Sequence, residues 1–157
     1  MAGLLGVFIA GYTGVLLSVT NRPIWADSPW LGALFIASGA STGAATLILL
    51  GPRRGATEQS LARLSAFDSK ALLVELLVLV LFIVSLGSVN RVWVSFWGLL
   101  LLVGVVGFGI LAPLRMHAQG RPLAAAAKLV LLGGFLLRLA TIFASEGIER
   151  YRVAAGM

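Results

Sequence analysis

Glu75 is the only acidic residue inside the long apolar segments of this 157-residue chain. A carboxylate in hydrocarbon is costly, so an ionisable side chain at that depth is a candidate for function. The helical rise of 1.5 Å per residue places Glu75 only about 7 Å from Lys70. Two interpretations follow: Glu75 exchanges protons, or it pairs with Lys70 near the membrane surface.

Arg138 lies deeper, within the apolar sequence GGFLLRLATIF. About ten residues of helix separate it from Lys128, so it falls near the middle of a membrane, where a guanidinium needs an internal partner. The depths of Glu75 and Arg138 differ by about 8 Å if both helices begin on the same side, so contact requires tilt, long side chains or a bridging water. A structural ion pair and a proton-transfer pair both fit this pattern.

A block of small and polar residues, ASGASTGAAT, occupies positions 37–46. The hydroxyl groups of Ser38, Ser41 and Thr42 are candidates for lining a proton path. Gly39 and Gly43 form a GxxxG pair, which is typical of close helix packing. Packing is also the role expected of the glycines in the later apolar segments, Gly98, Gly104, Gly107, Gly109, Gly133 and Gly134.

Tyr12 lies in the first apolar segment, where a phenol needs a hydrogen-bond partner. That partner is either a neighbouring helix or a quinone carbonyl, which makes Tyr12 the candidate quinone contact. The connector that follows carries Arg22, Trp25 and Trp30. Its tryptophans fit anchoring at the headgroup level or a docking surface for a partner subunit.

Other kinds of chemistry are excluded by residue type. The chain has no cysteine, so it contains no disulfide, thiolate metal site or iron–sulfur cluster of its own. His117 is the only histidine, which excludes a bis-histidine haem, and its charged surroundings predict a solvated loop residue. No catalytic nucleophile–base pair, metal-ligand cluster or phosphate-binding loop is present in the sequence. We therefore expect no haem and no metal in this chain.

The composition predicts the elements that must hold these residues. Hydrophobic residues make up 59% of the chain, charged residues 11%, and the mean hydropathy is +1.01. A spanning helix needs about 20 apolar residues, and five such segments are expected at 2–20, 31–50, 71–87, 94–114 and 124–145. We predict an all-α membrane protein with a single transmembrane domain over residues 1–157. A short interfacial helix is expected at 56–67, with Asp68 or Ser69 capping the third spanning helix.

The positions of the charges predict the partners and the orientation. The net charge is +6, but the basic residues gather at helix ends, as topology signals and lipid contacts do, rather than as a nucleic-acid surface. One side has Arg53, Arg54, Arg63, Lys70, Arg115, Arg121 and Lys128, and the other has Arg22, Arg91, Arg150 and Arg152. This bias predicts a cytoplasmic N-terminus and an external C-terminus. Met1 leads directly into apolar sequence, so we expect no removable signal peptide and a beginning like the interior of a longer protein.

The order of motifs resembles the polysulfide reductase membrane-subunit family (NrfD-like) over essentially the whole chain. The matching residues are Tyr12, Gly14, Leu16, Leu17, Arg22, Pro23, Trp25, Ser38, Ser41–Ala45, Leu72–Leu77 with Glu75, and Gly133–Arg138. The resemblance implies a membrane subunit of a respiratory oxidoreductase complex in a prokaryotic cytoplasmic (inner) membrane. It also implies a quinone, either menaquinone or ubiquinone, bound near an iron–sulfur partner subunit.

Members of that family are typically about twice this long. The chain resembles the last helix of their first bundle followed by their second bundle, so the last four helices would form one four-helix bundle. Much of the family's quinone pocket comes from the first bundle. The resemblance therefore implies either a separate chain that supplies the missing half and shares the quinone or, without one, a remnant or an assembly role for this chain. The resemblance places Tyr12 beside that pocket and leaves Glu75 and Arg138 for proton transfer.

Three functions therefore stay open at this point. The first is a non-catalytic subunit that supports quinone chemistry and proton transfer. The second is a structural or assembly anchor without a quinone site. The third is a small proton- or solute-translocating bundle, which rests on the polar second helix.

Overall fold

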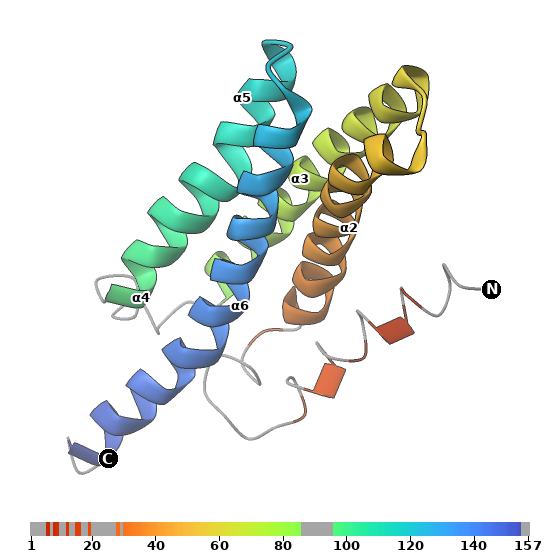
Figure 1. Ribbon diagram of the computed structural model, residues 1–157. Coiled ribbons are helices and arrows are strands. Elements are labelled where there is room, and N and C mark those ends of the chain that lie inside the picture. The colour runs from red at the N-terminus through yellow and green to blue at the C-terminus, as the bar shows by residue number, and fades with distance from the viewer. Residues whose placement is uncertain are drawn as a thin grey trace.

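The computed structural model describes the backbone of residues 30–85 and 96–154 and the side chains of residues 30–85 and 98–143. It also describes isolated positions before residue 30, namely Gly6, Phe8, Ile9, Tyr12, Val15, Leu16, Val19 and Ser28. Within these parts all regular structure is helical (Figure 1). Most of the expected first segment, 2–20, and most of the connector that contains Arg22 and Trp25 lie outside the described residues.

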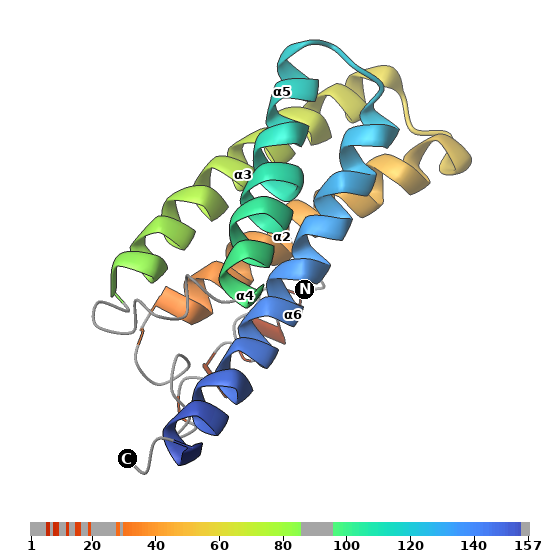
Figure 2. The same ribbon diagram turned by 90° about the vertical axis from the view of Figure 1, so that its left-hand side faces the viewer.

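The first long hairpin joins α2 (Trp30–Leu50) to α3 (Glu58–Ser85) through the short 3₁₀ turn η1 (Gly51–Arg54). The turn closes at Gly55, whose φ of 72° lies in the left-handed region that glycine adopts without strain. At the other end of the hairpin, the Ser28 and Ser85 hydroxyl oxygens lie 2.6 Å apart. The two helices therefore lie side by side in opposite directions (Figure 2).

Helix α3 begins 13 residues before the expected third segment, 71–87. The Thr57 hydroxyl accepts a hydrogen bond from the Ser60 backbone N–H at 3.2 Å, so Thr57 caps the helix. No glycine or proline follows within α3, and the expected interfacial helix therefore merges with the expected spanning helix. The predicted cap at Asp68 or Ser69 is wrong, because both residues lie in the helix interior.

The second hairpin consists of α4 (Phe96–Leu99), the π-helix η3 (Leu100–Leu111), α5 (Ala112–Ala118) and α6 (Leu123–Ala154). The first three follow one another without interruption as a single rod (Figure 1). Helix α6 packs on this rod and also on α2, while α2 packs on α3. Helix α6 therefore contacts both hairpins: it packs on η3 within its own hairpin and on α2 of the first hairpin.

Glycines set the closest approach between η3 and α6. A Cβ atom added at Gly109 would lie 2.6 Å from the Gly133 Cα atom, so the two backbones touch there. This is the packing expected of small residues between membrane helices. By contrast, a Cβ atom added at Gly43 would meet nothing within 4 Å. The prediction that Gly43 mediates close packing is therefore wrong within the described structure.

Three described helical segments are long and apolar enough to cross a membrane: Trp30–Arg54, Leu100–Ala118 and Leu123–Phe143. Helix α3 carries Asp68, Lys70 and Glu75 within its last 18 residues, which makes it more polar than these three. The alternating directions of the helices bring the turns at 51–57 and 119–122 to the same end (Figure 1). We call this the basic end, and its exposed charges are Arg53, Arg54, Arg63, Lys70, Arg115, Arg121 and Lys128.

Candidate functional site

Glu75 lies where α2 and α3 pack together, and it is only 3% exposed. The Ser41 hydroxyl on α2 donates a hydrogen bond of 2.8 Å to Glu75 Oε2. The same hydroxyl lies 3.1 Å from the Ser38 carbonyl oxygen of its own helix. Small residues at this part of α2 leave room for the carboxylate, so the serine side chain reaches it directly. Glu75 thus has an internal partner and does not depend on Lys70.

Two further hydroxyl groups of α2 face different surroundings. The Ser38 side chain is fully buried beside Glu75, and its oxygen has no hydrogen-bond partner among the described residues. The Thr42 hydroxyl donates to the Ser38 carbonyl at 2.7 Å and lies 3.3 Å from the Gly39 carbonyl. Such bonds to the preceding turn are common for threonine in helices. Ser38 is therefore the hydroxyl that lies beside the carboxylate without being bonded to its own helix.

Arg138 approaches from α6. Its Nη1 donates to the Gly134 carbonyl at 2.8 Å, and its guanidinium lies 5.7 Å from the centre of the Phe35 ring. Among the described side chains Arg138 makes no direct ion pair with Glu75, although its charge acts on that carboxylate from a greater distance. The structural ion pair that the sequence left open is therefore not formed in the described structure.

Gly134 lets these groups converge. A Cβ atom there would collide with the Thr42 methyl group and would lie 3.4 Å from Ser38 Oγ and 3.3 Å from Arg138 Nη1. The absence of a side chain at this one position leaves space between α2 and α6. All five residues singled out for proton transfer, namely Ser38, Ser41, Thr42, Glu75 and Arg138, are thus brought together at the contacts of α2 with α3 and α6. Their role in proton transfer stays a prediction.

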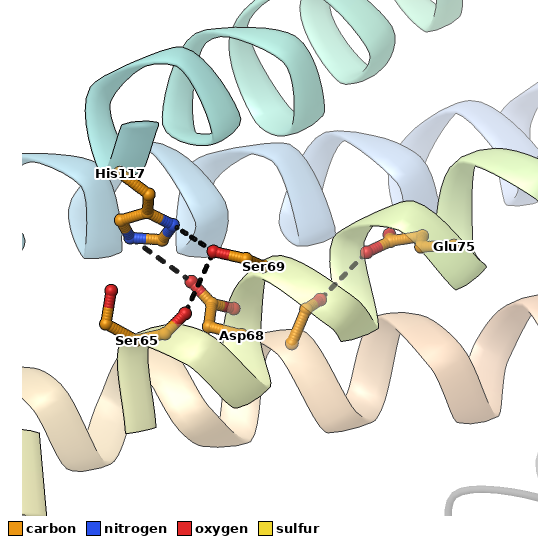
Figure 3. Close-up of polar contacts among 6 residues, drawn as sticks. Ser65, Asp68, Ser69, Glu75 and His117 are labelled. Carbon is orange, nitrogen blue, oxygen red and sulfur yellow. Dashed lines mark hydrogen bonds and ion pairs between the residues drawn. The ribbon is translucent and has the colours of Figure 1, made fainter. Parts of the chain in front are cut away.

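A second polar group lies on α3 toward the basic end, and the sequence did not predict it (Figure 3). Asp68 is fully buried, and its Oδ2 lies 3.7 Å from His117 Nε2 at the end of α5. His117 Nδ1 lies 3.1 Å from the Ser69 hydroxyl, which donates to the Ser65 carbonyl at 2.9 Å. The prediction that His117 is a solvated loop residue is wrong: its side chain is 5% exposed, because α5 continues to Ala118 and carries the ring against α3.

The electrostatics of Asp68 follow from this burial. Asp68 precedes the apolar segment that begins at Ala71, and neither of its carboxylate oxygens has a hydrogen-bond partner among the described residues. Burial, with a smaller contribution from the negative charge of Glu75, raises the pKa of Asp68 from 3.8 to about 7. The group therefore changes charge near neutral pH.

A signal for this second group exists in the sequence. Asp68 precedes Glu75 by seven residues, and such positions share one face of a continuous helix. The signal was obscured because Asp68 lies in the polar stretch Ser65–Lys70, where a helix cap is the usual interpretation. No glycine or proline lies between Glu58 and Ser85, and this absence of a helix breaker is the feature that predicts one continuous helix with both carboxylates on one face.

The remaining candidates lie elsewhere. Tyr12 is 53% exposed and stacks on Phe8 with ring centres 5.9 Å apart, and no described contact joins it to Glu75. Trp30 begins α2 and is 38% exposed, whereas Arg22 and Trp25 lie outside the described residues. No group of three or more potential metal ligands occurs in the described part of the chain. The quinone and docking roles stay predictions.

The chain is similar to known proteins over most of its length. The family model described as "Polysulfide reductase" (NrfD_2) matches residues 1–151. A protein described as "Protein NrfD homolog" from Haemophilus influenzae is 29% identical over 163 residues, which cover 91% of this chain and 50% of that protein. The chain thus spans about half the length of this curated relative. No solved structure matches this chain. From its apolar helices and the match over nearly its full length, this chain is a membrane protein that belongs to the polysulfide reductase (NrfD-like) family.

Proposed function

We propose that the chain is a membrane subunit of a respiratory oxidoreductase complex that supports quinone chemistry, with Glu75 as its proton-exchanging group. The observation that carries this proposal is the environment of Glu75: a carboxylate buried between helices, with a hydroxyl donor on α2 and no direct ion pair among the described residues. A carboxylate in a direct ion pair is held in its charged form. Without that pair, Glu75 can take up and release a proton.

The neighbours of Glu75 suit such an exchange. Ser41 contacts the carboxylate directly, and the unpartnered hydroxyl of Ser38 lies beside it. A hydroxyl both donates and accepts, so each serine can pass a proton on. The guanidinium of Arg138 reaches this region from α6 without forming a direct ion pair with the carboxylate. Thr42, whose hydroxyl is bonded to its own helix, would have a packing role at Gly134.

Quinone chemistry requires such a group, because reduction of a quinone takes up protons together with electrons. Tyr12 is our candidate for the quinone contact, since its phenol is half exposed. The quinone, menaquinone or ubiquinone, would be shared with a separate chain that supplies the half of the relatives this chain does not span. An iron–sulfur subunit would exchange the electrons and dock near Arg22, Trp25 and Trp30. We place the complex in a prokaryotic cytoplasmic membrane with the basic end facing the cytoplasm.

The experiment is to purify the chain with the subunits that accompany it and to measure turnover in liposomes, with proton uptake when quinone is reduced or proton release when quinol is oxidised. Glu75→Gln keeps the shape of the side chain but cannot ionise. Loss of a positioned proton-transfer group slows such reactions by about 10²-fold or more, and we expect that loss here. Glu58→Gln is the matched control, because Glu58 is an exposed carboxylate on the same helix.

Other results would point to the other functions. Normal turnover and proton uptake in Glu75→Gln would refute the proton role. If Tyr12→Phe also had no effect and no quinone copurified, the chain would serve as a structural or assembly anchor. Proton or solute flux through the chain without any redox partner would indicate a translocating bundle.

A further inference from the structure

Asp68, His117 and Ser69 form a group of buried polar side chains that the proposed role of Glu75 does not use. Asp68 and Ser69 come from α3, and His117 comes from α5, the segment that precedes the turn into α6. Figure 3 shows the Asp68 carboxylate pointing toward the imidazole ring, with Glu75 further along the same helix. Three atoms of this group, Asp68 Oδ1, Asp68 Oδ2 and His117 Nε2, are buried without a hydrogen-bond partner among the described residues.

Such an arrangement is unusual. Most buried polar atoms in proteins are hydrogen-bonded, and leaving one unpaired is costly. Here unpaired acceptors from two different helices face each other at 3.7 Å. This separation is slightly too long for a direct hydrogen bond and short enough for a small movement or one water molecule to connect the two groups.

The hydrogen bonds of the ring determine where its proton lies. Ser69 has a single hydroxyl hydrogen, and it donates that hydrogen to the Ser65 carbonyl. His117 Nδ1 must then carry a hydrogen to donate to the Ser69 oxygen. In the neutral ring this leaves Nε2 with a lone pair directed at Asp68. A proton can therefore sit on Asp68 Oδ2 or on His117 Nε2.

We propose that Asp68 and His117 form a proton-loading pair that holds one shared proton at the basic end of the protein and passes it inward toward Glu75. In the step itself the proton leaves His117 Nε2 and bonds to Asp68 Oδ2, on the helix that also carries Glu75. An imidazolium and a carboxylate become a neutral ring and a neutral acid, and the total charge is unchanged. Ser69 is a positioning residue, because it fixes the ring through Nδ1 and leaves Nε2 free to react.

The pair is coupled to Glu75 through charge. Seven residues of helix separate the two carboxylates, which corresponds to a rise of about 10 Å. Across that distance the negative charge of Glu75 still favours the protonated form of Asp68. A deprotonated Glu75 therefore promotes loading of the pair with the next proton. This coupling rests on the proposed role of Glu75, whereas the shared proton of the pair does not.

Other charges leave the pair largely undisturbed. Among the described residues, Glu75 on α3 and His117 on α5 are the ionisable groups that face Asp68. The remaining charges of the basic end are exposed on the surface, and these are the acidic Glu58 and the basic Arg53, Arg54, Arg63, Lys70, Arg115, Arg121 and Lys128. Solvent screens exposed charges strongly, so these side chains do not fix the charge of the pair.

The test is an infrared titration of the full chain in detergent, with no quinone and no partner subunit. The carbonyl stretch of a protonated carboxylic acid is followed from about pH 5 to about pH 9, a range that brackets the pKa of a histidine and of a buried carboxyl group. Protonated Glu75 also contributes a band, which Glu75→Gln removes; the band of Asp68 is expected to disappear with a midpoint near pH 7. Asp68→Asn should abolish this band, and Glu58→Gln should leave it unchanged.

Two variants separate the shared proton from the coupling. In His117→Gln the carboxyl group loses its competitor, so its band should persist to higher pH. In Glu75→Gln the midpoint should move to lower pH, because a negative charge is removed. An unchanged midpoint in His117→Gln would refute the shared proton, even if Asp68→Asn failed to fold. If Asp68→Asn removed no band from the spectrum, the proposal would also be refuted.

The infrared test of the Asp68–His117 pair and the turnover test of Glu75 can fail independently. If Glu75→Gln has normal quinol turnover while the Asp68 band behaves as expected, the proton role of Glu75 is refuted and the pair stands. If Glu75→Gln abolishes turnover while no band depends on Asp68, the pair is refuted and the proposed function stands.

Discussion

Two carboxylates on the same face of α3 have different surroundings. Glu75 receives a hydrogen bond from Ser41 and lies within the field of Arg138. Asp68, two turns toward the basic end, receives no hydrogen bond from any described residue and faces His117 at 3.7 Å. We therefore propose different roles for the two carboxylates. Glu75 is fixed in place by its neighbours, whereas Asp68 is left free to share a proton with a ring that is itself fixed by Ser69.

The effects of changing either carboxylate must be distinguished from the effects of simply disturbing the fold. Gly133→Leu provides the reference for such damage, because a side chain there collides with the Gly109 backbone. Overpacking of this kind costs about 1–3 kcal/mol or more, and we expect the largest fall in thermal stability of any variant considered. Gly43→Leu is the control, since a Cβ atom at Gly43 meets nothing within 4 Å. Equal stability of the two variants would contradict the close approach of η3 and α6.

Ser41→Ala removes the one feature that most clearly separates the two carboxylates. A hydrogen bond to a charged group contributes about 1.5–3 kcal/mol, so thermal unfolding in detergent should show a loss of that size at a pH where Glu75 is ionised. Thr46→Ala is the matched control, because Thr46 is exposed and its hydroxyl donates to the Thr42 carbonyl of its own helix. Indistinguishable stabilities would show that Ser41 does not support Glu75.

Asp68 should make the stability of the protein depend on pH. Its pKa is raised in the folded state from 3.8 to about 7, so the folded protein binds the proton more tightly than the unfolded chain does. The resulting stabilisation is complete below about pH 4 and is lost as the pH rises through about 7, with a slope of at most about 1.4 kcal/mol per pH unit. Unfolding measured across this range should show the slope in the wild type and in Glu58→Gln. A slope of the same size in Asp68→Asn would contradict the assignment.

The smallest effect is expected at the residue that positions the ring. Ser69→Ala removes the hydrogen bond to His117 Nδ1, which corresponds to about 0.5–1.5 kcal/mol. It should also shift the Asp68 infrared midpoint, because the ring is no longer held with Nε2 toward the carboxyl group. Ser65→Ala is the control, since Ser65 accepts through its backbone carbonyl, which alanine retains. If both variants shifted the midpoint equally, Ser69 would have no positioning role.

The two carboxylates also show what the sequence can and cannot reveal. Glu75 was identified because it interrupts a run of Leu and Val, and such an interruption is visible without any structure. Asp68, close to Ser65, Ser69 and Lys70, fits a helix cap by its local sequence, whereas its contact with His117 comes from the distant helix α5. Its partner His117 was misplaced for the same reason, since contacts between distant segments are not encoded in local composition.

A similar limit applies to the glycines and to the helices. The motif at Gly39 and Gly43 looked like a packing interface, yet Gly43 faces open space, while the less regular glycines of η3 and α6 meet closely. The helical class and the family resemblance were confirmed. The number of spanning segments and the four-helix bundle stay predictions, because much of the first expected segment lies outside the described residues and α3 is more polar than the other long helices.

The most direct test of a single proton route through both carboxylates is a double-mutant cycle on turnover-linked proton uptake by the purified complex in liposomes. The variants are Glu75→Gln, Asp68→Asn and the two combined. Residues that act in one route are not additive. We predict that the double variant loses no more proton uptake than Glu75→Gln alone. If the two losses multiply instead, Asp68 and Glu75 act independently and the single proton route is wrong.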